Sequence, residues 1–121
     1  MQSITITLPL PDKCLSPNAR CHWAVKSKAV AKLRRFAELE TRNVAGRVVL
    51  GWKQAKYTAR FYFPTSRRRD ADNAIASIKS ALDGVADAGL IANDSGLWPE
   101  RPEFYTDKDN PRVEITFTKE A

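Results

Sequence analysis

The sequence contains few of the residues that build disulfide frameworks and zinc sites. Its 121 residues include two cysteines, Cys14 and Cys21, and a single histidine, His22. These three soft ligands have no fourth partner at the spacing of a zinc finger or ribbon, so a structural zinc site is not expected. A secreted domain held by one disulfide bridge is conceivable. Because no signal segment is apparent, however, we expect two reduced thiols in a cytoplasmic protein.

Long apolar runs and targeting segments are also lacking. No stretch of about 18 uncharged apolar residues occurs, which argues against a membrane-spanning helix. The first 11 residues have neither a basic start nor a long apolar stretch, so we expect no signal peptide. The sequence shows no internal repeat, low-complexity tract or linker. Its length therefore fits one domain over residues 1–121, built around a single core.

The charge changes sign along the chain. The sequence has 20 Lys and Arg residues against 14 Asp and Glu residues, a net charge of +6. From Arg20 to Arg69 there are 14 basic residues against two acidic ones, a local charge of +12. From Asp70 to Asn110 there are nine acids against three bases, a local charge of −6. This layout indicates an anion-binding surface beside a carboxylate cluster.

Hydrophobic periodicity predicts a mixed α/β (α+β) domain. Strands are predicted at Ser3–Leu8, at Lys56–Phe63, around Phe104 and Tyr105, and at Arg112–Thr118. Helices are predicted from Trp23 to about Val44, ending at Gly46, and from about Asn73 to Ala88, ending at Gly89. The order β-α-β-α-β-β favours a small sheet of about four strands with two main helices on one face.

The same periodicity predicts which side chains form the core. The first helix is expected to bury Val30, Leu33, Phe36 or Ala37, and Val44, and the second Ile75, Ile78, Leu82 and Val85. The strands are expected to point Tyr57, Ala59, Phe61, Phe63, Val113, Ile115 and Phe117 inward.

The loop before the second predicted helix carries two neighbouring carboxylates, Asp70 and Asp72. Two carboxylates this close repel each other unless a cation lies between them. Mg²⁺ typically takes one or two protein carboxylates together with waters and phosphate oxygens. The alternative is that Asp72 only caps the helix by accepting the amides of Ala74 or Ile75.

Basic side chains surround these carboxylates. Arg67, Arg68 and Arg69 directly precede Asp70, which places phosphate-binding groups beside metal-binding groups, although a basic run is also typical of a solvated surface. Lys79 lies seven residues after Asp72, nearly two helical turns, so we expect its ammonium to point back at the carboxylates. A plain surface lysine is the alternative.

Two further aspartates follow along the chain. Asp94 lies in a predicted turn after the helix, where turn chemistry alone would explain it. Asp83 is four residues after Lys79, which favours an ordinary surface ion pair between the two.

The chain resembles the RusA family of Holliday junction resolvases, small crossover junction endodeoxyribonucleases common in phages and prophages. The opening residues Ser16, Asn18, Arg20, His22 and Trp23 resemble the family's S-x-N-x-R-x-H-W pattern. Asp70, Asp72 and Asn73 match its D-x-D-N signature, which is preceded by basic residues. The family's K-x-x-x-D helix is resembled by Lys79–Asp83, followed by Ala88-Gly89. Its D-D-S turn is resembled by Asp94-Ser95, and its last strand by Asn110–Ile115.

The chain departs from the family pattern at two positions. The family lysine most often follows the second aspartate by four residues, where this chain has Ala76, and Lys79 comes three residues later. The trailing pair is Asn93-Asp94 rather than two aspartates, so only Asp94 carries over as a carboxylate.

The resemblance implies a fold, an activity and a set of partners. It implies a homodimer that binds four-way junctions and other branched DNA and cuts two strands symmetrically, in DNA recombination and repair. It implies Mg²⁺, or Mn²⁺ in its place, held by Asp70, Asp72 and Asp94, with Lys79 stabilising the transition state. The expected location is the cytoplasm of a bacterial host.

The basic first half of the chain would then bind DNA. The candidate phosphate contacts are Arg20, Lys26, Lys28, Lys32, Arg35, Arg67, Arg68 and Arg69. A solvated helix face remains the alternative for those in the first helix. For His22 we favour packing or capping over catalysis, and for Trp23 and Trp98 core packing over stacking on a base.

Two other functions stay open. One is a catalytically weak or inactive accessory protein with the same fold that binds junction DNA, which the displaced lysine suggests. The other is a small enzyme that acts on a different phosphate substrate.

Overall fold

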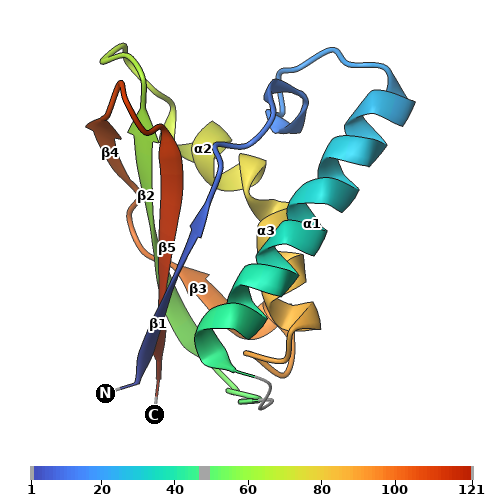
Figure 1. Ribbon diagram of the computed structural model, residues 1–121, viewed down its shortest axis with the longest axis vertical. Helices are drawn as coiled ribbons and strands as arrows, with labels where there is room; N and C mark the ends of the chain where they lie inside the picture. The colour runs from blue at the N-terminus through green and yellow to red at the C-terminus, as the bar shows by residue number, and fades with distance from the viewer. Residues whose placement is uncertain (1, 47–49, 121) are drawn as a thin grey trace.

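The computed structural model describes residues 2–46 and 50–120 (Figure 1). Its strands are β1 (Ser3–Leu8), β2 (Ala55–Phe63), β3 (Leu97–Pro99), β4 (Glu103–Thr106) and β5 (Arg112–Lys119). Its helices are α1 (Trp23–Ala45), α2 (Ala71–Ser77) and α3 (Lys79–Asp87), with short 3₁₀ turns η1 (Lys13–Leu15) and η2 (Asp94–Gly96). The prediction of a mixed α+β domain is confirmed, although the described residues form five strands instead of about four, because the short β3 was not predicted.

The sheet is mixed, and its strand order is β1-β5-β2-β3, with β4 also paired to β2. β5 lies between β1 and β2 and is antiparallel to both. β3 and β4 each run parallel to β2, at its beginning and at its end. The end of β2 therefore lies inside the sheet, and the chain leaves it through the loop that carries Asp70.

The helices cover one face of the sheet, as Figure 1 shows. The inward residues of β2 and β5 predicted from alternation are buried, except that Phe63 is partly buried. On the opposite face the side chains are polar, and the Thr5 and Thr116 hydroxyls lie 2.8 Å apart across β1 and β5. The period of two thus decides which sheet face the helices cover.

Helix α1 buries a narrower stripe than the sequence suggests. Leu33, Ala37 and Thr41 are buried, whereas Phe36 is 40% exposed and Val44 is 50% exposed. The expectation that Val44 is buried is wrong, and of the two alternatives it is Ala37 that packs inward. A small residue lies there because α3 approaches α1 closely.

That close approach depends on Gly84 of α3. A Cβ at Gly84 would collide with the backbone carbonyl oxygen of Arg34 and lie 3.1 Å from the Cβ of Ala37. Beside this contact, Arg34 Nε donates a 2.6 Å bond to Asp87 Oδ2. Helices α1 and α3 are therefore held close together by the contact at Gly84 and by the ion pair between Arg34 and Asp87.

The predicted second helix is divided into two. Ile78 lies between α2 and α3 with φ −103° and ψ 11°, outside helical geometry. Its N–H donates to the Ile75 carbonyl, and the Ser77 hydroxyl donates to the Ala74 carbonyl at 2.6 Å. A serine that bonds to its own backbone competes with the helical pattern. The expectation of one continuous helix is wrong, although Ile78 is buried as predicted.

The two cysteines are joined. Cys14, at the end of the first loop, forms a disulfide with Cys21, just before α1. The expectation of two reduced thiols is therefore wrong, and neither sulfur is available as a thiolate ligand for zinc. None of the helices in the described residues has the length and hydropathy that a membrane span needs.

Candidate functional site

The loop between β2 and α2 holds the two neighbouring carboxylates at the surface. Asp70 is the N-cap of α2, and its Oδ1 accepts the N–H of Asn73 at 3.1 Å. Asp72 lies in the first turn, so the alternative that Asp72 only caps the helix is wrong: the cap is Asp70. Both are exposed and line one open hollow together with Arg68 and Arg69. The helix N-terminus favours negative charge at this place.

Arg69 anchors the loop rather than extending into solvent. Its guanidinium lies over the ring of Phe63, 3.9 Å from the centroid, a cation–π contact. Its Nη2 also donates to the hydroxyl of Thr65 at 3.1 Å. Burial, and then the charge of Arg67, lower the pKa of Arg69. This contact could not be predicted from the sequence, because Phe63 belongs to the pattern of a strand and Arg69 to that of the following loop.

One N–H group of Arg69 has no hydrogen-bond acceptor among the described residues. It is the Nε group, which is buried. Arg67 and Arg68, by contrast, are exposed. The three arginines therefore differ: one fixes the loop, and two present positive charge next to Asp70.

A groove runs from this loop to the segment that follows β1. Its volume is about 830 Å³, and the rings of Phe61 and Phe63 form part of its wall. Arg67, Arg68 and Arg69 line it together with Lys13, from η1. Phe61 is buried and the ring of Phe63 is covered by the guanidinium of Arg69, so the basic side chains, and not free aromatic rings, are what this groove presents to a partner. Asp70 lies at its edge.

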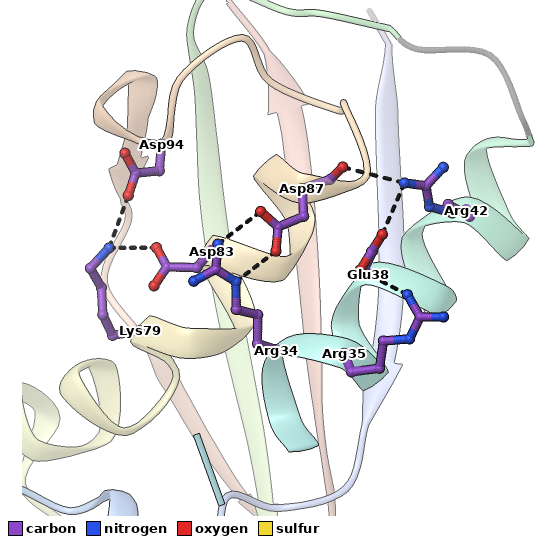
Figure 2. Close-up of polar contacts among 8 residues, drawn as sticks. All are labelled: Arg34, Arg35, Glu38, Arg42, Lys79, Asp83, Asp87 and Asp94. Carbon is purple, nitrogen blue, oxygen red and sulfur yellow. Dashed lines mark hydrogen bonds and ion pairs between the residues drawn. The ribbon is translucent and has the colours of Figure 1, made fainter. Parts of the chain in front are cut away.

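Lys79 lies elsewhere than the sequence predicted. It is the first residue of α3, and its Nζ donates to Asp83 Oδ1 at 2.8 Å and to Asp94 Oδ2 at 3.0 Å (Figure 2). The prediction of a Lys79–Asp83 ion pair is confirmed. The expectation that Lys79 points back at Asp72 is wrong, since the break at Ile78 ends the continuous helix face on which it depended.

The contacts of Lys79 shift the pKa values of both partners. The hydrogen bond to Asp83, and then the one to Asp94, raise the pKa of Lys79. The hydrogen bond from Lys79 lowers the pKa of Asp94. Lys79 and Asp94 are therefore joined in an ion pair.

The three carboxylates expected to hold a metal are not gathered in one place. Among residues 2–46 and 50–120 there is no group of three or more His, Cys, Asp or Glu residues that could hold a metal ion. Asp70 and Asp72 share a hollow, whereas Asp94 is bonded to Lys79. The first pair fits Mg²⁺, which needs only one or two carboxylates. The Asp94 carboxylate does not fit while Lys79 binds it.

The basic residues of the first half fall into two groups. Arg35 and Arg42 both form ion pairs with Glu38 (Figure 2). The N–O distances are 3.2 and 2.9 Å. Arg35 is therefore partly neutralised by its neighbour. Seven other candidates form no ion pair within the described part of the chain, and six of them are exposed: Arg20, Lys26, Lys28, Lys32, Arg67 and Arg68. The seventh, Arg69, is half-buried.

The start of α1 carries two aromatic residues with different roles. His22 is the N-cap, and its Nδ1 accepts the N–H of Ala24 at 3.2 Å, which confirms capping. Trp23 is 76% exposed, and Trp98 in β3 is 57% exposed. The expectation that both tryptophans pack in the core is wrong. Their exposed rings are available for stacking on a partner.

Acid should weaken the fold through the paired carboxylates. Basic partners lower the pKa values of Glu38, Asp87, Asp94 and Asp107. A carboxyl group with a lowered folded pKa contributes stability above its unfolded pKa, and this is lost as the pH falls through the folded pKa. We expect the melting temperature to fall as the pH drops below about 4.

The variant Lys79→Met tests the contribution of Asp94. Without the lysine the pKa of Asp94 returns toward its ordinary value, so the loss of stability in acid becomes smaller than in the unchanged protein. Thermal melts followed by circular dichroism from neutral to acid pH measure this. Identical pH profiles for the two proteins would show that the pair makes no contribution.

Comparisons with known proteins leave the family open. No protein-family model matches the sequence. An uncharacterized protein of Xylella fastidiosa (strain Temecula1) is 40% identical over 95 residues, covering 72% of this chain and 58% of that protein. The chain thus spans less than two thirds of the length of this relative.

The structural comparison finds periplasmic domains of Helicobacter pylori MotB. Residues 97–256 of MotB align with a TM-score of 0.42 and 15% identity, covering 99% of this chain and 85% of that one. A structure of residues 78–256 gives a TM-score of 0.41 and 14% identity, covering 100% and 80%. Scores this low carry no argument about fold or function.

Proposed function

We propose that this protein is a metal-dependent, structure-selective DNA endonuclease that resolves four-way junctions. One observation carries the proposal: Asp70 and Asp72 line the same hollow as Arg68 and Arg69. Phosphodiester cleavage needs groups that hold the backbone next to groups that bind a cation. The resemblance to the RusA family supports the proposal, because its D-x-D-N signature falls on these same residues.

Asp70 and Asp72 would hold the cation, with Mg²⁺ or Mn²⁺ as the natural choices. A divalent cation supplies Lewis-acid stabilisation of the negative charge that develops during phosphodiester hydrolysis. Arg67 and Arg68 would bind the phosphates on either side of the bond that is cut. Arg69 would keep the loop rigid through its contacts with Phe63 and Thr65.

Lys79 and Asp94 have a different part in the proposal. The side chain of Lys79 is 63% exposed, so its ammonium can approach a phosphate from outside the hollow. Binding of DNA would compete with Asp83 and Asp94 for this ammonium, which could then stabilise negative charge on a phosphate.

The test uses a labelled four-way junction and a linear duplex of the same sequence. With Mg²⁺ we expect paired nicks in the junction, no nicks in the duplex, and no cleavage of either when the metal is chelated. Nicking of the duplex at the same rate would contradict structure selectivity. Cleavage that persists in chelator would contradict the role of the metal.

A second candidate function is an accessory protein that binds junctions without cutting them. The observation in its favour is that Asp94 is bonded to Lys79 and does not join Asp70 and Asp72. Under this alternative the protein binds junction DNA tightly, and a titration with Mg²⁺ or Mn²⁺ yields no nicked product at any concentration.

Both candidates predict strongly salt-dependent DNA binding. If the six exposed basic residues without an ion pair each contact a phosphate, the logarithm of the affinity should fall against the logarithm of the salt concentration with a slope of about −5. Fluorescence anisotropy with a labelled junction at several salt concentrations measures the slope. A slope near about −1 would exclude this surface as the binding site.

The matched control compares two basic residues of α1, Lys32 and Arg35. Lys32→Gln removes a charge that has no described ion pair, and should reduce the slope by about one. Arg35→Gln removes a charge that is already bound to Glu38, and should change the slope much less.

A further inference from the structure

The indole ring of Trp23 lies in solvent at the first turn of α1. Trp23 is 76% exposed, more than any other large apolar residue in the described part of the chain. Its aromatic neighbour is His22, whose ring centroid lies 5.6 Å from that of Trp23. Tryptophan offers a large flat apolar surface for stacking, together with one N–H group that can remain in water.

The backbone around Trp23 is fixed on both sides. Cys21, two residues before it, is joined by a disulfide to Cys14, which is buried. On the other side, His22 closes the first turn of α1 by accepting the N–H of Ala24. An aromatic side chain on a fixed backbone loses little conformational entropy when it binds, which favours its use as a contact with a partner.

The surface around Trp23 is basic. Residues 20–33 include four basic side chains and no Asp or Glu. All four are exposed and form no ion pair within the described residues: Arg20, Lys26, Lys28 and Lys32. Lys26 follows Trp23 by three residues and so lies on the same side of the helix. An exposed ring beside unpaired cations suits a nucleotide, whose base stacks while its phosphate meets positive charge.

The disulfide also connects the start of α1 to the basic groove. The Cα atoms of Cys14 and Cys21 are 5.6 Å apart. Lys13, the residue before Cys14, lines the groove together with Arg67. In Figure 1 the blue loop that carries the bridge lies between α2 and the start of α1. The positive surface of the groove therefore continues toward Trp23.

We propose that Trp23 stacks on an unstacked base at the branch point of bound DNA and thereby sets the preference for branched over linear DNA. In a linear duplex each base pair is covered by its neighbours on both faces, so the ring has no free base face to contact. At a branch point the stack is interrupted, and a base can be reached without the free-energy cost of opening a duplex. The inference rests on the DNA binding in the proposed function, but not on cleavage.

Trp98 of β3 provides a matched comparison. It is also exposed, at 57%. In the sheet it lies opposite Lys56, which is bound by Glu100 and Glu120 at 3.5 Å each. Two acids therefore outweigh the one base beside Trp98, and this surface repels phosphates. We expect only Trp23 to contact DNA.

Binding of DNA by the full chain, measured by fluorescence anisotropy in the presence of a chelator, tests the inference without cleavage. The ligands are a labelled four-way junction and a linear duplex with the same arm sequences. We expect Trp23→Ala to weaken junction binding about tenfold or more and to change duplex binding less than about twofold. Trp23→Phe keeps an aromatic face and should retain most of the preference, and Trp98→Ala should bind both ligands normally.

Tryptophan emission reports the stacking itself. Trp52 is buried, so in a Trp98→Phe protein the emission sensitive to a ligand comes from Trp23. Stacking on a base quenches indole fluorescence. We expect the junction to quench this emission and the linear duplex to quench it much less, and we expect no quenching when Trp23→Phe is added. Far-UV circular dichroism checks that each variant is folded.

Three results would overturn the inference. They are a Trp23→Ala protein that keeps its preference for the junction, a Trp23→Ala protein that loses junction and duplex affinity equally, and Trp23 emission that the junction leaves unchanged. Absence of junction binding by the unchanged protein would overturn both the inference and the proposed function. If the expected binding and quenching are observed but Mg²⁺ yields no nicks, only the nuclease proposal is contradicted.

Discussion

We expect Asp70→Asn and Asp72→Asn each to reduce Mg²⁺-dependent nicking of a four-way junction by about 100-fold or more, with junction affinity nearly unchanged. Each substitution removes one negative charge and keeps the side-chain shape. Removing a carboxylate weakens the hold on the cation, but adds no repulsion toward DNA. Nicking and binding should therefore separate.

The position of Asp70 makes its variant easy to interpret. Asp70 caps α2 through the N–H of Asn73, and asparagine is as good a cap as aspartate. The helix should keep its start, so lost activity would reflect lost charge. Asp109→Asn, an exposed change in the turn before β5, is the matched control and should leave nicking unchanged. Activity at the normal level in both Asp70→Asn and Asp72→Asn would refute the proposed site.

Binding separates the two candidate functions. If the unchanged protein nicks the junction and the two variants only bind it, the endonuclease proposal is supported. If the unchanged protein binds but never nicks, and the variants bind identically, the accessory function is supported. Loss of binding in the variants would point instead to a structural role for the loop.

Gly84→Ala should lower the free energy of unfolding by about 2 kcal/mol or more, although alanine is the better helix former by about 1 kcal/mol. The new methyl group would collide with the carbonyl oxygen of Arg34 in α1. A backbone atom cannot move aside as a flexible side chain can, so the two helices must separate. The change would also disturb the ion pair between Arg34 and Asp87.

Gly46→Ala is the control for this effect. Gly46 ends α1 with φ +81°, and a Cβ there would meet no atom within 4 Å. The cost should be about 1–3 kcal/mol and should come from the backbone alone, because φ +81° with ψ −171° is a conformation that essentially only glycine adopts. Chemical denaturation of both variants measures the difference. A Gly84→Ala protein as stable as the unchanged one would mean that α1 and α3 do not approach so closely.

Local patterns determined much of the fold. Strands β1, β2 and β5 lie within a residue or so of their predicted ranges, because alternation of apolar and polar residues fixes both the strand and its inward face. Helix α1 begins at Trp23 as predicted, after a capping His22. β3 was missed, because three residues are too short to show a period.

The candidate site was only partly predictable. The neighbouring positions of Arg67–Arg69 and Asp70 in the chain already implied that their side chains share a surface. The sequence could not show that Arg69 turns back onto Phe63, or that Lys79 binds Asp83 and Asp94 instead of facing Asp72. These contacts depend on the direction of the chain after Pro64 and on the break at Ile78.

By itself the sequence determined the first helix and the longer strands, the two faces of the sheet and the meeting of opposite charges at Arg69-Asp70, since each of these follows from residues close together in the chain. Only the tertiary structure decided that the second helix divides, that Cys14 joins Cys21, that both tryptophans are exposed and that Asp94 lies apart from Asp70 and Asp72. Those outcomes depend on how distant segments pack, and a one-residue break changes the direction of every side chain that follows it.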